Sequence, residues 1–268
     1  DVFKARMKEL YNYERFGLPV KKGGKYFYSR NSGLQNQSVL YVRDTLAGEG
    51  RVVIDPNGWS KDGATALAEW LPSEDGSKVL YGVQDGGTDW RTLKVLNVAT
   101  GQLLSDTIEW VKFSGLSWAK DGSGFFYSAF PAPAEGAKFQ ALNENQKVFF
   151  HKLGTPQSAD RLIYATPDKP RQGHIAQLTD DGRWLVIATT QGTDRRYEVH
   201  VIDQTQPGAA PQMVFAGLEY EWQLAGNAGA TLFWKTNSGA PKLRIVATDL
   251  SKAGELPAIR EIVPEDKA

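Results

Sequence analysis

Residues 178–187, which read Leu-Thr-Asp-Asp-Gly-Arg-Trp-Leu-Val-Ile, predict two strands joined by a tight turn. Asp180 and Asp181 favour a turn because an aspartate can hydrogen-bond its own backbone, and Gly182 accepts a positive φ. The aromatic and β-branched residues that follow are typical of a strand. This stretch is therefore read as a β-hairpin.

The same hairpin pattern recurs along the chain. Aligning the turn glycines gives intervals of 53, 46, 60 and 47 residues, for Gly23, Gly76, Gly122, Gly182 and Gly229. A period of roughly 40 to 50 residues is typical of propellers and solenoids. Each repeat divides into four strands with no helix between them, which favours propeller blades. A sandwich and a β-solenoid are the alternative folds.

The expected fold is all-β, with a short helix over residues 1–15 and four-stranded antiparallel propeller blades over residues 16–268. The helix is indicated by apolar residues at helical spacing, namely Phe3, Met7, Leu10 and Tyr11. The first blade has a weak opening strand at 16–21, and the last blade ends without a closing partner. About five blades are thus expected, with strands 103–109 and 113–119 on either side of the boundary between the second and third.

Composition narrows the function classes. The 31 basic and 31 acidic residues cancel and form no long block, so no nucleic-acid partner is expected. The absence of cysteine excludes disulfides, thiol catalysis and cysteine-bound zinc. No apolar run reaches the roughly 20 residues of a membrane helix, so a soluble protein is expected. Cytoplasm and periplasm both stay open as its location.

Motifs that suggest chemistry have simpler structural interpretations. Gly115-Leu116-Ser117-Trp118-Ala119 is close to a nucleophile elbow, but Ser117 lies within a predicted strand rather than between a strand and a helix. The three histidines lie in separate repeats without metal-ligand spacing. The acidic pairs recur at equivalent turns, whereas an active site is normally unique. We therefore expect no catalytic residue, metal or cofactor in this chain.

Three long loops follow second strands of the blades, at 129–146, 191–196 and 85–91. Loops on one face of a propeller are the usual location of binding residues. They are the best candidates for a binding surface, although solvated connectors are the simpler reading of any one of them.

Several stretches closely resemble the propeller domain of the prolyl oligopeptidase family. They include Ala-Arg-Met-Lys-Glu-Leu-Tyr-Asn-Tyr at 5–13 and Asn-Ser-Gly-Leu-Gln-Asn-Gln-Ser-Val-Leu-Tyr-Val at 31–42. The likeness continues through Thr-Asp-Trp at 88–90, Val-Lys-Phe-Ser at 111–114, Gly-Thr-Pro-Gln-Ser at 154–158 and residues 178–183. It covers essentially the whole chain in order.

The resemblance implies a seven-bladed propeller that caps an α/β-hydrolase domain, whose serine, aspartate and histidine cleave short peptides after proline. This chain resembles the helix before the propeller and the first five blades, so it is expected to be inactive alone. Its expected partners are short proline-containing peptides and the hydrolase domain of a monomeric parent protein. The alternatives are a stand-alone propeller that acts as an interaction scaffold, and a related oligopeptidase specific for basic residues.

Two propeller positions of the family reach the substrate pocket. Phe126 matches an aromatic residue on the strand after the third-blade turn. Thr190 stands where the family has an arginine that holds the peptide backbone, near the end of the second strand of blade four. Arg195 and Arg196 are the candidates to replace that arginine, unless the peptide is anchored in another way.

Overall fold

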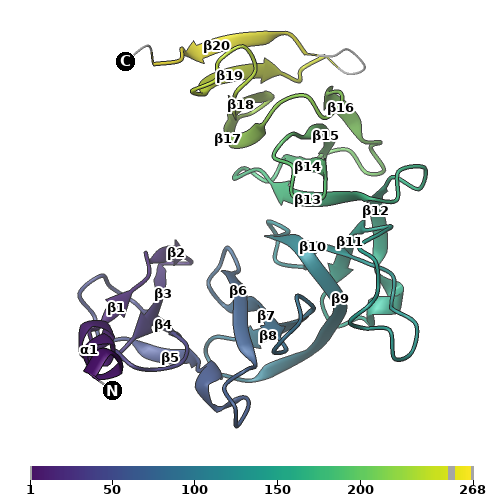
Figure 1. Ribbon diagram of the computed structural model, residues 1–268. Coiled ribbons are helices and arrows are strands. Elements are labelled where there is room, and N and C mark those ends of the chain that lie inside the picture. Colours follow the sequence, from purple (N-terminus) through teal and green to yellow (C-terminus); the bar gives the residue numbers. More distant parts are fainter. Residues whose placement is uncertain (1, 253–256, 267–268) are drawn as a thin grey trace. The chain divides into compact units, whose positions relative to one another are not determined.

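The computed structural model describes residues 2–252 and 257–266. The chain divides into two compact units, one formed by Asp1–Val111 with Gly154–Ser158 and the other by Lys112–Leu153 with Ala159–Ala268. Figure 1 follows the chain from purple to yellow through strands β1 to β20. Each unit is built from antiparallel sheets of neighbouring strands, as the repeat pattern predicts.

The first unit begins with the helix α1 (Val2–Tyr11), whose side chains are all exposed. The predicted helix over 1–15 is too long, because Arg15 already pairs with Asn31 in a sheet. Phe3, Met7, Leu10 and Tyr11 are each more than half exposed.

The first sheet combines β1 (Arg15–Phe16), β2 (Val20–Lys22), β3 (Lys25–Asn31), β4 (Val39–Arg43) and β5 (Arg51–Ile54). Both β1 and β2 pair with β3. The weak opening strand predicted at 16–21 is therefore split in two. Gly17 and Pro19 fall in the gap, where the Gly17 amide donates to the carbonyl of Ser29 at 2.9 Å. The 3₁₀ turn Pro56–Gly58 follows β5.

The second blade also lies in the first unit and contains β6 (Ala66–Pro72), β7 (Lys78–Gln84), β8 (Arg91–Asn97) and the start of β9 (Leu103–Trp118). Its strands pair in chain order. Buried apolar residues of the two sheets form one cluster: Phe27, Leu40, Val42, Ile54, Val79, Tyr81, Leu96 and Val98. This burial is the main source of stability for sheets that have no helix to cover them.

Strand β9 corrects one expectation, because the predicted strands 103–109 and 113–119 are a single strand. Residues 103–111 belong to the first unit and residues 112–118 to the second. Trp110 and Phe113 have φ values of 60° and 52°. Positive φ is uncommon for residues other than glycine, so the strand is locally irregular here, although no loop interrupts it.

The second unit contains three groups of strands that pair in chain order. β10 (Gly124–Ala129), β11 (Lys147–Lys152) and β12 (Arg161–Ala165) continue from the end of β9, and the 3₁₀ turn Gln157–Ala159 precedes β12. The fourth blade is β13 (Gln172–Leu178), β14 (Trp184–Gln191), β15 (Glu198–Asp203) and β16 (Gln212–Phe215). The fifth is β17 (Trp222–Ala228), β18 (Thr231–Thr236), β19 (Arg244–Asp249) and β20 (Ile259–Val263).

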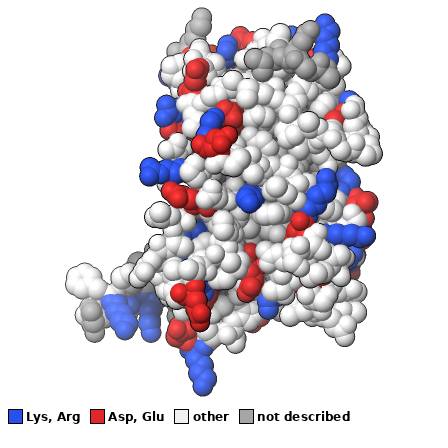
Figure 2. Space-filling view, turned by 90° about the vertical axis from the view of Figure 1, so that its right-hand side faces the viewer, with Lys and Arg blue, Asp and Glu red and all other residues white. Residues whose placement is uncertain are grey.

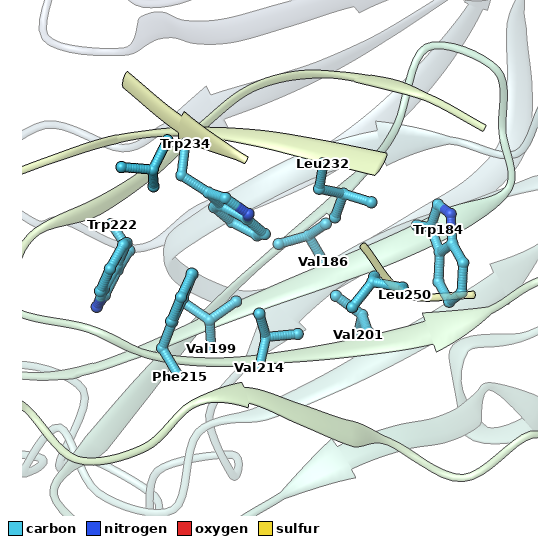
Figure 3. Packing of buried hydrophobic residues seen from close by; sticks show 11 residues of the cluster. Trp184, Val186, Val199, Val201, Val214, Phe215, Trp222, Leu232, Trp234 and Leu250 are labelled. Atoms are coloured by element: carbon cyan, nitrogen blue, oxygen red, sulfur yellow. The ribbon is translucent and has the colours of Figure 1, made fainter. Parts of the chain in front are cut away.

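Aromatic side chains join the fourth and fifth blades (Figure 3). The ring of Phe215 stacks on that of Trp222, with centroids 3.5 Å apart and planes within 4°. The indole nitrogens of Trp184 and Trp234 donate to the Gly229 carbonyl and the Thr248 hydroxyl, both at 2.9 Å. These tryptophans thus bury large apolar surfaces without leaving an N–H group unpaired.

A hydrogen-bonded turn connects β13 to β14. The Thr179 hydroxyl donates to the Asp181 carboxylate at 2.7 Å and accepts the Trp184 amide at 3.0 Å. The Arg183 amide donates to the same carboxylate, and Gly182 has a φ of 76°. The aspartate is therefore used to close the turn, as the recurrence of the acidic pairs predicts.

The turn of the second blade repeats this arrangement with serines. The Ser73 hydroxyl donates to Asp75 at 2.6 Å, and the Ser77 amide and hydroxyl donate to it as well. These hydrogen bonds, first among them the one from Ser73, lower the pKa of Asp75 to about 2. The carboxylate is consequently ionised at any pH at which the fold is expected to function.

The surface carries both signs of charge. On the face shown in Figure 2, basic and acidic side chains are interspersed. Among the described residues, no helix is long and apolar enough to cross a membrane.

The lowered pKa of Asp75 predicts how an Asp75→Asn substitution changes the pH dependence of stability. A carboxyl group with a folded pKa of about 2, below its ordinary 3.8, adds stability above the ordinary value and loses it as the pH falls toward 2. Wild-type protein should be more stable than the variant at pH 6, and the difference should vanish near pH 2. Urea unfolding across this range measures the difference, and a gap that stays constant with pH would contradict the assignment.

Candidate functional site

A pocket of about 370 Å³ lies in the second unit, at the ends of β13 and β14 that are remote from their turn. Four segments line it: Phe113 on β9, the loop before β11, the start of β13, and the end of β14 with the loop after it, which contribute Thr190, residues 192–195 and Tyr197. Two of the three loops singled out in the sequence, 129–146 and 191–196, therefore contribute to one pocket.

Gln146 forms a buried support for this pocket. Its Oε1 accepts the His174 amide at 2.6 Å, and its Nε2 donates to the Lys112 carbonyl at 2.8 Å. The side chain is 2% exposed. Both ends of its amide are thus used to tie β9, the loop before β11 and β13 together.

The imidazole of His174 lies in the same support. Its Nδ1 is 2.9 Å from the Thr189 hydroxyl and its Nε2 is 3.3 Å from the Thr166 hydroxyl. Burial, and secondarily the nearby His200, lowers the pKa of His174 to about 4. The imidazole is therefore neutral near pH 7. His174 lines the pocket, but both ring nitrogens already have a hydroxyl partner, so the imidazole is a structural group.

Two of the predicted site residues, Thr190 and Arg195, line the pocket. The Thr190 hydroxyl donates to the Asp194 carbonyl at 2.8 Å, which closes the loop after β14. The exposed Arg195 side chain makes no hydrogen bond or ion pair with the described residues. Its guanidinium is free to bind a group that enters the pocket.

Arg196, the other candidate, is already paired. Its guanidinium binds the Asp194 carboxylate in an ion pair that also includes a 3.0 Å hydrogen bond from Nε. The hydrogen bonds from Arg196 lower the pKa of Asp194 to about 2. Arg196 does not line the pocket, and its charge is neutralised by Asp194 within the loop.

Phe126, the third predicted contact, lies away from the pocket lining. It is 3% exposed and packs in an apolar cluster with Val148, Leu185 and Ile187. Phe113 lines the pocket instead and is 53% exposed. Phe113 occurs in the Val-Lys-Phe-Ser stretch that carries the family resemblance, but residue spacing predicts neither its φ of 52° nor its place in the pocket lining.

Ser117 and the histidines have structural contacts, in keeping with the simpler interpretations of these motifs. The Ser117 hydroxyl, in β9, accepts the Leu178 amide at 3.0 Å. His151 is fully buried against Asp160, with Nδ1 2.7 Å from the carboxylate, and His200 lies 3.2 Å from the Tyr164 hydroxyl. Within the described ranges, no three His, Asp or Glu side chains gather as a metal site would require.

Comparison with known proteins identifies the family. A family model described as the prolyl oligopeptidase N-terminal β-propeller domain matches residues 1–268. The chain belongs to the prolyl oligopeptidase family. A prolyl endopeptidase from Elizabethkingia meningoseptica is 38% identical over 251 residues, which cover 93% of this chain and 35% of that protein.

Solved structures of the family share the fold. One, from a study of two prolyl endopeptidases and their inter-domain dynamics, is 45% identical with a TM-score of 0.88 and covers 98% of this chain and 37% of its own. Prolyl oligopeptidase B from Galerina marginata, bound to a 25-residue macrocyclization substrate, is 28% identical with a TM-score of 0.88 and covers 100% and 40%. The expected propeller fold and the family resemblance are thus confirmed, and this chain spans about a third of its relatives' length.

Phe126 and Phe113 should differ in their contribution to stability. Phe126→Ala removes a buried ring, so it should lower the free energy of unfolding by about 3–5 kcal/mol. Phe113→Ala should change it by less than about 0.5 kcal/mol, because its side chain is exposed. Urea unfolding measures both effects. A Phe126→Ala variant as stable as wild type would contradict the burial of this ring.

Proposed function

We propose that this chain is the propeller part of a serine peptidase that cleaves short peptides after proline, and that its pocket binds the peptide. The observation that supports this most strongly is the match of the propeller family over all 268 residues, at 38% identity to a prolyl endopeptidase. The pocket lies where the loops after the second strands gather, which is the binding face expected from the sequence.

The chemistry of bond cleavage would be supplied outside this chain. The three histidines are at most 9% exposed, so none is placed to act as a general base for an accessible serine. Acyl transfer through a serine, with a histidine base and an oxyanion hole, belongs to the hydrolase domain expected in the parent protein. The propeller contributes binding and steric selection, which excludes folded proteins and admits short peptides.

Residues around the pocket offer contacts suited to a peptide. Phe113 presents an apolar ring, and Arg195 presents unpaired guanidinium donors for backbone carbonyls. Arg195 would replace the arginine that the family resemblance places at Thr190. This assignment favours Arg195 over Arg196, whose charge is neutralised by Asp194.

The activity is tested with the full-length protein and short chromogenic peptides that differ only in the residue before the cleaved bond. Cleavage after proline, with at least tenfold lower rates for alanine and arginine peptides, is expected. Loss of activity with a serine-directed organophosphate should accompany it. Cleavage after arginine would favour the basic-specific relative, and no cleavage of any peptide would favour a scaffold. Purified residues 1–268 should show no turnover.

Arg195→Ala in the full-length protein should raise KM for a proline peptide by roughly tenfold, because hydrogen bonds to charged groups contribute about 1.5–3 kcal/mol. Arg196→Ala is the matched control and should change KM by less than about twofold. Steady-state kinetics on both variants decides between them. An unchanged KM in both would show that neither arginine anchors the peptide.

A further inference from the structure

Gln172, at the start of β13, has a polar atom with no partner. The side chain is 6% exposed, and its Oε1 is buried without a hydrogen bond to any described residue. Burying an amide oxygen without a partner is unfavourable, and such atoms are uncommon in folded proteins. Gln172 also lines the pocket described above.

Gln146 shows what a structural glutamine looks like in the same pocket. Both ends of its amide are hydrogen-bonded, to the His174 amide and the Lys112 carbonyl. Gln172 is buried nearly as deeply, yet its side chain makes no hydrogen bond to a described residue, and its backbone amide donates to the Lys169 carbonyl at 3.0 Å. Its side chain therefore makes no comparable contribution to holding the pocket together.

We propose that the Gln172 side-chain oxygen accepts a hydrogen bond from a backbone N–H of the bound peptide. The inference rests on the proposed peptide-binding function and adds a specificity residue to it. A peptide N–H is the donor that a substrate of this class supplies at regular intervals. Proline lacks an N–H, so the donor belongs to another residue of the substrate. Gln172 would then contact a residue of the peptide other than the proline.

The register of the sheet positions this acceptor. Gln172 pairs with Gln191, and Gly173 pairs with Thr190 on the strand that leads into Arg195. Gln172 on β13 and Arg195 after β14 both line the pocket. A peptide backbone alternates N–H donors and carbonyl acceptors, so it can satisfy both groups at once.

The test uses the full-length protein and a set of proline peptides that are N-methylated at one amide at a time. Wild-type protein should show a roughly tenfold rise in KM, equivalent to about 1.4 kcal/mol, at one methylated position. Gln172→Met, which keeps the volume but removes the acceptor, should lose this discrimination to within about twofold. Gln191→Met makes the same change on the exposed neighbour and should retain the discrimination.

A second measurement separates binding from structure. Removing an unsatisfied buried oxygen should leave the unfolding midpoint of Gln172→Met equal to or above that of wild type. A lowered midpoint would show that Gln172 is structural and would overturn the proposal. It is also overturned if proline peptides are cleaved without discrimination at any amide, or if Gln172→Met discriminates as wild type does. Absence of any proline-peptide cleavage would instead contradict the proposed function, while the midpoint still reports on Gln172.

Discussion

The hydrogen-bonded turn at residues 179–184 sets the geometry on which the pocket depends. The Thr179 hydroxyl and the Asp181 carboxylate bond each other and accept the amides of Trp184 and Arg183, and the Gly182 amide donates to the Thr179 carbonyl. That closure aligns Leu178 with Leu185 and, further along the ladder, Gly173 with Thr190. A shift of one residue would exchange the two faces of each strand, moving buried side chains to the other side. The turn at one end therefore decides which side chains line the pocket at the other.

Because side chains alternate between the two faces of a strand, neighbouring residues of β14 have different surroundings. Leu185 and Ile187 pack in the apolar cluster, and Thr189 bonds the His174 imidazole. Thr190, one position further, lines the pocket. Gln172 lies on the same face of β13 as His174, lines the pocket and carries an unpaired oxygen.

The repeated turns made the architecture predictable, because each Asp-Gly turn closes a hairpin through local hydrogen bonds. Strand ends were less predictable, since they depend on pairing across the sheet. The helix ends at Tyr11 because Arg15 pairs with Asn31, and β9 continues through Trp110 and Phe113 at positive φ. Neither feature has a local sequence signal, as both residues in β9 are of a type that rarely adopts this backbone conformation.

The place of a residue along a strand was predictable, whereas contacts that depend on partners in space were not. Counting from the turn placed Thr190 at the end of β14, where it lines the pocket. The difference between Arg195 and Arg196 depends on which one contacts Asp194, and sequence does not show this. The burial of Phe126 and the exposure of Phe113 likewise depend on how β9 and β10 pack, which the sequence does not show. The unpaired side-chain oxygen of Gln172 can likewise be recognised only in the structure.

Photo-crosslinking tests the central claim, that a proline peptide binds in the pocket at the ends of β13 and β14. A short peptide with a photoreactive phenylalanine next to its proline would be irradiated with the full-length protein, and the labelled propeller residues identified by mass spectrometry. The account predicts labels within residues 171–175 or 190–197, suppressed by excess unlabelled peptide. Saturable labelling that falls entirely outside the pocket-lining segments would contradict it.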